Sequence, residues 1–221
     1  MTLVLSIGGS VIGGDQDRLS EYAEMLHRLA SDHTVFVVVG GGETARDYIS
    51  RARMWGADEA FCDLIGIAVT RLNARLLIAA LGNRAYPVPP ETHEDAAIAV
   101  LSGRIVVMGG TVPGHTTDAV AAILAEFVHA DLMINATSTD GIYTSDPKKD
   151  PNAVKLDKIS PRRLIEIIAG SKMEAGANLP LDMLAAKVIE RSGVPTVVVD
   201  GRRPQSLFDA VLGKSVGTRV Q

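Results

Sequence analysis

The sequence is poor in cysteine, in aromatic residues and in positive charge. Its one cysteine, Cys62, excludes an internal disulfide and a site of several cysteine ligands, and we expect a small buried core residue. Aromatic residues make up only 4% of the chain, so Val, Ile, Leu and Ala must form the core. A formal net charge of −4 without a basic cluster argues against nucleic acid as a partner.

Long hydrophobic runs are also scarce. The opening MTLVLSIGGS has no basic region and becomes glycine-rich after seven positions. We expect no apolar run in the chain to approach the length of a membrane span. We therefore expect a cytoplasmic protein without a membrane partner. The length of 221 residues permits one large domain or two small ones, and 47% hydrophobic residues are typical of a globular protein.

Apolar strands alternate with helical patterns along the chain. Strands are predicted at Leu3–Ile7, Thr34–Val39, Tyr86–Val88, Ile105–Met108, Leu132–Ala136, Thr196–Asp200 and Gly217–Val220. Helices are predicted at Leu19–Leu29, Glu43–Trp55, Asp58–Leu81, Glu94–Leu101, Arg162–Ala169 and Leu181–Ser192. This alternation indicates an α/β protein with a parallel sheet covered by helices on both faces.

The composition changes near Thr137. The segment Thr137–Val154 is rich in Thr, Ser, Asp, Gly, Pro and Lys, and we interpret it as a long loop or hairpin at the ligand edge. Met173–Pro180 is expected to be mobile. Because no repeat or linker accompanies the change, we expect two lobes of one sheet rather than two independent domains.

The most informative stretch is Arg104–Val128, RIVVMGGTVPGHTTDAVAAILAEFV. A β-branched strand runs into a loop of three glycines and three threonines, and a helix follows with Asp118 in its first turn. Glycines allow backbone N–H groups to approach a ligand, and an anion is favoured at a helix N-terminus. The alternative is an ordinary turn in which Thr116 or Thr117 is only an N-cap.

Four loops of this kind follow predicted strands, and in a parallel sheet they could converge on one edge. They are Gly8–Ser10, Gly40–Gly42, Gly109–Asp118 and Thr137–Asp146. Together they predict a large, phosphate-rich ligand. Gly213–Ser215 is no P-loop, because Phe208 stands where that motif needs glycine. Gly40–Ala45 matches a dinucleotide fingerprint weakly, with close helix–strand packing as its alternative.

Five motifs carry a resemblance to a known family. They are IGGS at 7–10, VVVGGGETAR at 37–46, DLIGIAVTRLNARLL at 63–77, GGTVPGHTTDAVAA at 109–122 and TSTDGIYTSDPKKDP at 137–151. In these motifs, and over essentially its whole length, the chain resembles the amino acid kinase superfamily, and within it the archaeal-type uridylate kinases.

The resemblance implies a fold, an activity and an assembly. The fold would be a three-layer α/β/α sandwich with a mainly parallel eight-stranded sheet, formed by residues 1–221 as a single domain. A lobe of about residues 1–130 would bind UMP and a lobe of about 131–221 would bind ATP. The implied activity makes UDP from UMP and ATP with Mg²⁺, and the implied assembly is a homohexamer.

The resemblance also implies site residues. ATP is assigned to Gly9, Ser10, Gly42, Arg46, Thr137, Tyr143 and Asp146. UMP is assigned to Gly41, Asp63, Thr111, Val112, Pro113, Gly114, His115, Thr116 and Thr117. Asp118 and Arg46 are assigned to catalysis, and no residue is assigned as a direct metal ligand. The bland alternatives are a surface ion pair with Asp47 or Glu43 for Arg46, and a helix cap for Asp63.

One departure concerns lysine. Many superfamily members carry lysine in the first strand, where this chain has Ser6, and its first lysine is Lys148. Mg²⁺, Arg46, helix N-termini and either Lys187 or Lys172 would then supply the positive charge. The alternatives are a kinase for a small carboxylate or isoprenoid phosphate, a non-catalytic nucleotide- or oxyanion-binding protein, and a dinucleotide-binding oxidoreductase.

Overall fold

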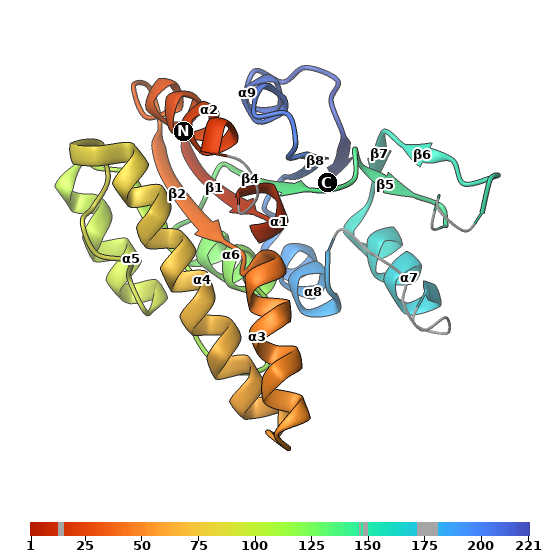
Figure 1. Ribbon diagram of the computed structural model, residues 1–221. Coiled ribbons are helices and arrows are strands. Elements are labelled where there is room, and N and C mark those ends of the chain that lie inside the picture. The colour runs from red at the N-terminus through yellow and green to blue at the C-terminus, as the bar shows by residue number, and fades with distance from the viewer. Residues whose placement is uncertain (13–15, 146, 148–149, 172–180) are drawn as a thin grey trace.

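The computed structural model describes residues 1–221 except 13–15, 146, 148–149 and 172–180. Its centre is a seven-stranded sheet in the order β3-β2-β1-β4-β8-β9-β7, and β5 pairs with β6 separately. The strands are β1 (Thr2–Ile7), β2 (Thr34–Val39), β3 (Val106–Met108), β4 (Leu132–Thr137), β5 (Ile142–Tyr143), β6 (Lys155–Leu156), β7 (Lys158–Ile159), β8 (Thr196–Asp200) and β9 (Thr218–Val220). Figure 1 shows this sheet between its helices.

The sheet is mainly parallel, as expected. The strands β3, β2, β1, β4 and β8 pair in parallel, whereas β9 runs antiparallel to β8. The expected eight strands are corrected to seven over the described ranges, since β5 and β6 form their own antiparallel hairpin. A loop or hairpin was predicted at Thr137–Val154; β5 lies inside that segment and β6 begins directly after it.

The predicted strand at Tyr86–Val88 is wrong. Only one isolated bridge forms there, between Ala85 and Ile105. Prolines stand at positions 87, 89 and 90, and proline has no N–H to donate to a strand ladder. The edge of the sheet beside β3 therefore ends in irregular chain.

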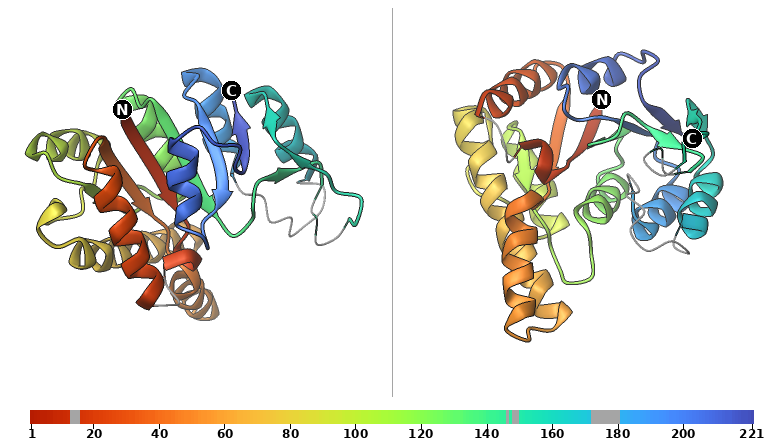
Figure 2. Two further views of the ribbon diagram at one scale, coloured as in Figure 1. Left: turned by 90° about the horizontal axis from the view of Figure 1, so that it is seen from above. Right: turned by 45° about the vertical axis from the view of Figure 1, so that its right-hand side comes forward.

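Helices cover both faces of the sheet. They are α1 (Gly9–Ile12), α2 (Gln16–Leu29), α3 (Gly42–Met54), α4 (Glu59–Leu81), α5 (His93–Ala99), α6 (Thr117–Phe127), α7 (Pro161–Ser171), α8 (Met183–Ser192) and α9 (Gln205–Val211), with short 3₁₀ turns η1 (Gly82–Arg84) and η2 (Val100–Ser102). Residues of α2, α4 and α9 pack on one face, and residues of α5, α6, α7 and α8 pack on the other. In the left view of Figure 2, α2 and α9 lie in front of the strands and α6 and α8 behind them.

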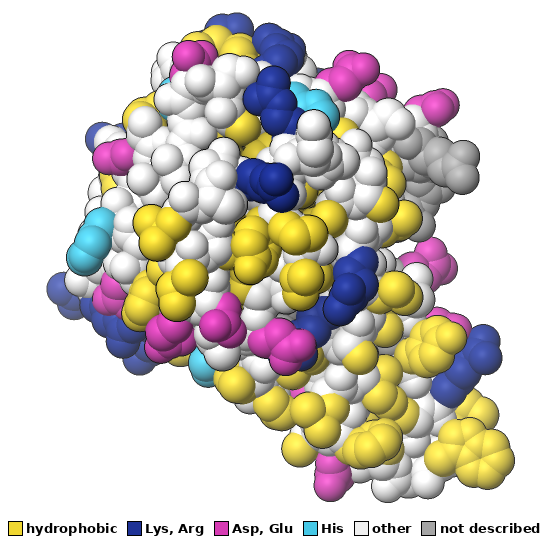
Figure 3. Space-filling view, turned by 90° about the vertical axis from the view of Figure 1, so that its left-hand side faces the viewer, with side chains coloured by type: hydrophobic (Ala, Val, Ile, Leu, Met, Phe, Trp, Pro, Cys, Tyr) yellow, Lys and Arg dark blue, Asp and Glu magenta, His cyan; other side chains and the backbone are white. Residues whose placement is uncertain are grey.

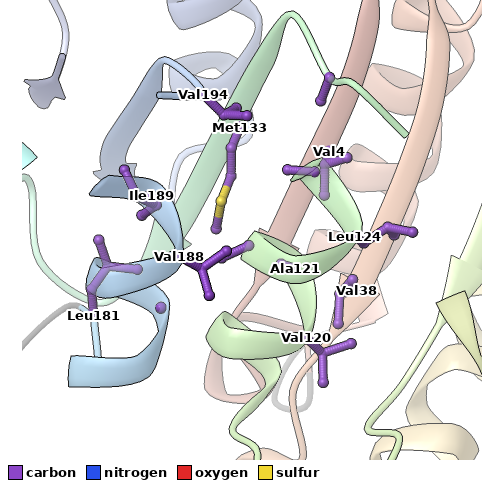
Figure 4. Packing of buried hydrophobic residues seen from close by; sticks show 14 of the residues in the cluster. Val4, Val38, Val120, Ala121, Leu124, Met133, Leu181, Val188, Ile189 and Val194 are labelled. Atoms are coloured by element: carbon purple, nitrogen blue, oxygen red, sulfur yellow. The ribbon is translucent and has the colours of Figure 1, made fainter. Parts of the chain in front are cut away.

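Alternation along the strands creates the two halves of the core. In β1, Leu3, Leu5 and Ile7 belong to the first half and Val4 belongs to the second, because successive side chains point to opposite faces. Figure 4 shows the second half, where α6 and α8 pack against the strands. Small residues of α6, among them Ala121, let that helix approach the sheet closely.

The long helix α4 is only partly explained by core packing. An 18-residue window within Glu59–Arg84 has a mean hydropathy of 1.7, so by length and composition alone this helix could span a membrane. The expectation that no apolar run reaches that length is therefore wrong. One third of the most apolar window is buried, including Ala74 and Leu77 on the sheet. Cys62 on α4 is buried and free, as predicted for a small core residue.

Candidate active site

The glycines after β1 and β2 bring two backbone segments into direct contact. A Cβ atom on Gly9 would lie 2.1 Å from the nitrogen of Gly42 and 2.5 Å from the oxygen of Gly40. Gly42 also has a φ of +65°, which favours glycine. The glycines therefore serve close packing, and they place the start of α3 beside Gly9 at the carboxyl edge of the sheet.

The chain after α3 does not support the dinucleotide fingerprint. That motif requires a further strand ending in an acidic residue about twenty positions on. Helix α3 is followed instead by α4, and Asp58, the nearest acidic candidate, is the N-cap of α4 through a 2.8 Å bond from the Phe61 N–H. The oxidoreductase alternative consequently has no structural basis at Gly40–Ala45.

A cavity of about 200 Å³ lies between α3, α4 and the loop that precedes α6. Its lining residues are Gly41, Gly42, Ala45, Asp63, Gly66, Ile67, Thr70, Gly110, His115, Thr116 and Thr117. It brings together Gly41, Asp63, His115, Thr116 and Thr117 of the residues assigned to UMP. The exposed residues Val112, Pro113 and Gly114 belong to the same loop but do not line the cavity.

Two polar atoms of this loop are buried without a hydrogen-bond partner in the part of the chain that the structure describes. They are Oγ1 of Thr111 and Nδ1 of His115. Buried polar groups are almost always paired, by protein, water or ligand. His115 lines the cavity, so its ring has hydrogen-bonding capacity left for a molecule bound there, whereas Thr111 does not line the cavity.

Asp63 lies in the second turn of α4. Its Oδ2 accepts a 2.7 Å hydrogen bond from the N–H of Gly114. Because Asp58 is the residue that caps α4, the helix-cap interpretation of Asp63 is wrong. The carboxylate instead joins α4 to the glycine-rich loop, and it lines the cavity.

Asp118 lies in the first turn of α6, where Thr116 is the N-cap that accepts from the Ala119 N–H. Its Oδ1 accepts a 2.7 Å hydrogen bond from the hydroxyl of Ser6 on β1. Burial and the nearby charge of Asp182 raise the pKa of the Asp118 carboxyl to about 6, against hydrogen bonds from Ser6 and Asn135 that lower it.

Asp182 is a site residue that the sequence did not reveal. It caps α8 through bonds of 2.7 Å and 3.1 Å from the N–H groups of Leu184 and Ala185, and it also accepts from the Thr116 hydroxyl. An aspartate before a helical pattern signals only an N-cap. Its approach to Asp118 depends on the packing of α8 beside α6, which no local signal shows.

Arg46 lies in the second turn of α3 and is exposed. The expected local alternative is not observed, since Asp47 pairs with Arg51 at 3.0 Å and Arg46 forms no ion pair with any residue the structure describes. Ser10 is exposed beside Gly9. Lys187 is exposed on α8, and Lys172 lies outside the described residues.

The residues assigned to ATP in the second half of the chain lie around the end of β4. Thr137 is the last residue of β4, and Tyr143 on β5 donates a 2.8 Å hydrogen bond to Asp140. Asp140 also pairs with Lys155 on β6 at 3.2 Å, which ties the hairpin together. Asp146 lies outside the described residues.

Residues 1–200 match the amino acid kinase family. This protein therefore belongs to the amino acid kinase family, a class to which the parallel sheet and the glycine-rich edge conform. Among its curated relatives, the uridylate kinase of Archaeoglobus fulgidus is 53% identical over 220 residues and is covered completely by this chain, which is itself covered completely. The uridylate kinase of Methanococcoides burtonii is 52% identical, with 99% of this chain and 94% of the relative covered.

Solved structures agree. The crystal structure of the Archaeoglobus fulgidus uridylate kinase superposes with a TM-score of 0.93 at 50% identity, and both chains are covered completely. The UMP kinase of Bacillus anthracis has a TM-score of 0.83 at 23% identity, with 100% of this chain and 95% of that chain covered. The second likeness supports the three-layer fold and nothing more specific.

Proposed function

We propose that this protein is a uridylate kinase, which transfers the γ-phosphate of MgATP to UMP and forms UDP and ADP for pyrimidine nucleotide synthesis. The observation that carries the proposal is the cavity between Asp63 on α4 and the loop before α6. There a carboxylate that can accept from ribose hydroxyls faces a helix N-terminus that attracts a phosphate. The full-length identity to uridylate kinases supports the same acceptor.

The proposed assignment divides the single domain into two lobes. Residues of about 1–130 bind UMP, through Gly41, Asp63, Thr111, Val112, Pro113, Gly114, His115, Thr116 and Thr117. Residues of about 131–221 bind the nucleoside of ATP, through Thr137, Tyr143 and Asp146. Gly9, Ser10, Gly42 and Arg46 bind its phosphates. The contact of Gly9 with Gly42 supports this arrangement, because it joins the two phosphate-binding segments directly.

The proposed reaction is one in-line displacement. A phosphate oxygen of UMP attacks the γ-phosphorus, the bond from that phosphorus to the β–γ bridging oxygen breaks, and ADP leaves with the electron pair. The negative charge is stabilised, as it redistributes, by the N-termini of α3 and α6 and by the guanidinium of Arg46. Asp118 orients the centre, since its carboxylate holds the hydroxyl of Ser6 from β1.

The residues fit a magnesium ion that arrives with ATP. Mg²⁺ prefers oxygen ligands and uses one or two carboxylates together with substrate phosphates. Asp182 accepts from the hydroxyl of Thr116, two positions before Asp118, so both carboxylates lie near the N-terminus of α6. We assign Asp118 to a water on the ion, and no residue as a direct ligand. When bound, the ion would neutralise charge on the ATP phosphates.

A coupled assay of ADP formation tests the acceptor. Purified protein with MgATP is offered UMP, CMP, AMP, a small carboxylate and isopentenyl phosphate. We expect UMP to give the highest kcat/KM, and calorimetry to show UMP binding in the absence of ATP. A higher kcat/KM for the carboxylate or the isoprenoid phosphate would replace the proposal by the corresponding kinase. Nucleotide binding without any turnover would indicate a non-catalytic relative.

We further propose that the protein works in the cytoplasm as a homohexamer. Support comes from an apolar surface on α3 and α4 that the core does not cover, and Figure 3 shows hydrophobic side chains along this projecting arm. Its exposed members are Tyr48, Met54, Trp55, Phe61, Leu64, Leu72 and Leu76. Trp55 is 89% exposed, and apolar patches of this kind mark interaction sites on soluble proteins.

Sedimentation velocity tests the assembly. We expect a hexamer mass for the unmodified protein and a smaller species for Trp55→Ser with Leu72→Ser. Val154→Ser removes an exposed apolar side chain far from α3 and α4, and it should leave the hexamer intact. A monomeric unmodified protein would contradict the proposal.

A further inference from the structure

The two polar backbone groups of Gly110 are both occupied by consecutive residues of α4. The N–H of Gly110 donates a 2.7 Å hydrogen bond to Oγ1 of Thr70. The carbonyl of Gly110 accepts a 3.2 Å bond from Nε of Arg71. The Thr70 hydroxyl donates its own proton to the carbonyl of Ile67 at 2.7 Å, so its oxygen is left free to accept from Gly110.

This contact leaves no space for a side chain at the neighbouring glycine. A Cβ on Gly109 would lie 2.6 Å from Oγ1 of Thr70 and 2.8 Å from the nitrogen of Arg71. The backbone of the loop therefore rests directly on α4. Asp63 makes a third attachment through the N–H of Gly114. One helix thus holds both ends of the loop that we assign to the acceptor.

Arg71 differs from Thr70 and Asp63, because it does not line the cavity. Its side chain is 25% exposed and its NH1 pairs with Oε2 of Glu91 at 2.7 Å. A planar guanidinium can hold a carbonyl with one edge and a carboxylate with another. Arg71 therefore links the loop to the segment before α5, where Thr92 caps that helix.

We infer that Arg71 is a positioning residue for the acceptor site, and that Glu91 orients it. The inference rests on the proposed function for the identity of the acceptor. Arg71 acts through Gly110: it fixes the carbonyl and so the direction in which the following residues of the loop present their donors. Pre-organisation of this kind lowers the ordering cost of ligand binding.

Kinetics of Arg71→Gln test the inference. Glutamine cannot bridge Gly110 and Glu91, and a lost charged hydrogen bond of about 1.4 kcal/mol corresponds to about tenfold in binding. We expect KM for UMP to rise about five- to tenfold, with KM for ATP and kcat changed less than twofold. Glu91→Gln keeps the Gly110 contact and should give a smaller rise in KM for UMP. Arg71→Lys can contact either Gly110 or Glu91 but not both at once, so its KM for UMP should lie between those of the unmodified protein and of Arg71→Gln.

Arg75→Gln is the matched control. Arg75 lies one turn further along α4, is exposed, and has no hydrogen bond or ion pair to the residues described. Its substitution should leave all three constants unchanged. A purely structural role for Arg71 would instead raise both Michaelis constants together, and that result would overturn the inference.

Amide hydrogen exchange of residues 109–117 supplies a readout that does not depend on turnover. We expect faster exchange in this loop for Arg71→Gln than for Arg75→Gln, with the rest of α4 unchanged. Unaltered exchange would overturn the positioning role even if the enzyme proves to be a uridylate kinase. If UMP is not phosphorylated by the unmodified protein, the proposed function fails, whereas the exchange result still decides the role of Arg71.

Discussion

Replacing Asp118 by asparagine is expected to stabilise the protein at high pH while it slows the reaction. Asparagine has nearly the same shape, and its carbonyl oxygen can still accept the hydroxyl of Ser6. It carries no charge, so the desolvation cost of the carboxylate and its repulsion from Asp182 both disappear. Stability and turnover therefore separate in one substitution.

The magnitude follows from the shift in pKa from 3.8 to about 6. One pKa unit corresponds to about 1.4 kcal/mol, so the ionised carboxylate destabilises the folded state by at most about 3 kcal/mol. The folded state binds more protons than the unfolded state between pH 3.8 and about 6. Stability therefore falls as the pH rises through this window, and the cost stays constant above it.

Urea unfolding at pH 4, 6 and 8, in EDTA and without nucleotide, measures the effect. We expect Asp118→Asn to be more stable than the unmodified protein by about 1–3 kcal/mol at pH 8, and the difference to vanish near pH 4. Asp32→Asn, at an exposed position, is the control. A gain that does not change with pH, or no gain at pH 8, would refute the reasoning from buried charge.

Turnover of the same variant tests its proposed role. In the unmodified protein, the rate should rise with pH as the carboxyl loses its proton near pH 6. Asp118→Asn should bind UMP normally but react slowly at every pH. Normal turnover would remove Asp118 from the mechanism.

Substitutions at four further positions test the proposed site. Asp63→Asn should raise KM for UMP far more than KM for ATP, at a cost of about 1–3 kcal/mol, and equal rises would return Asp63 to a structural role. Arg46→Ala should lower kcat more than it weakens binding in calorimetry, with partial rescue by lysine, which cannot fork onto a phosphate; full activity would assign Arg46 to the helix surface. Gly110→Val should abolish UMP binding by calorimetry, because a Cβ there would lie 3.0 Å from Cγ1 of Ile67, whereas Thr117→Ala should be milder; normal binding by folded Gly110→Val would move the acceptor site.

Much of the sheet was predictable because its strands are short and mostly apolar, with many β-branched residues. Thr34–Val39 and Thr196–Asp200 were predicted with the bounds that the structure shows. The helix predicted at Arg162–Ala169 begins at Pro161 in the structure. Its start is marked locally by Ser160, whose hydroxyl oxygen accepts from the Arg163 N–H at 3.2 Å. The strand predicted at Tyr86–Val88 does not form, because Pro87 within it and Pro89 and Pro90 after it have no N–H to donate to a ladder.

The candidate site was only partly predictable. The glycines and threonines of residues 109–117 predicted a loop at a strand end. Five of the residues assigned to UMP line one cavity in the structure, and their binding of UMP stays a prediction. Arg46 was predicted to lie on a helix, but the sequence did not show whether it forms an ion pair with Asp47. In the structure Asp47 pairs with Arg51, one turn further along the helix. Thr70 and Arg71 lie in the motif at 63–77, but neither they nor Asp182 gave a signal of their contacts, since each is an ordinary residue for a helix or its cap.

By itself, the sequence determined the alternation of strands and helices, the glycine-rich turns and the family resemblance. These depend on local propensity, on periodicity and on short motifs, which are properties of neighbouring residues. Only the tertiary structure decided that Ser6 reaches Asp118 across 112 positions, that Asp182 meets Thr116, and that Arg71 holds Gly110. These contacts form because α4, α6 and α8 pack around one edge of the sheet. Patterns among neighbouring residues do not show which distant segments will pack together.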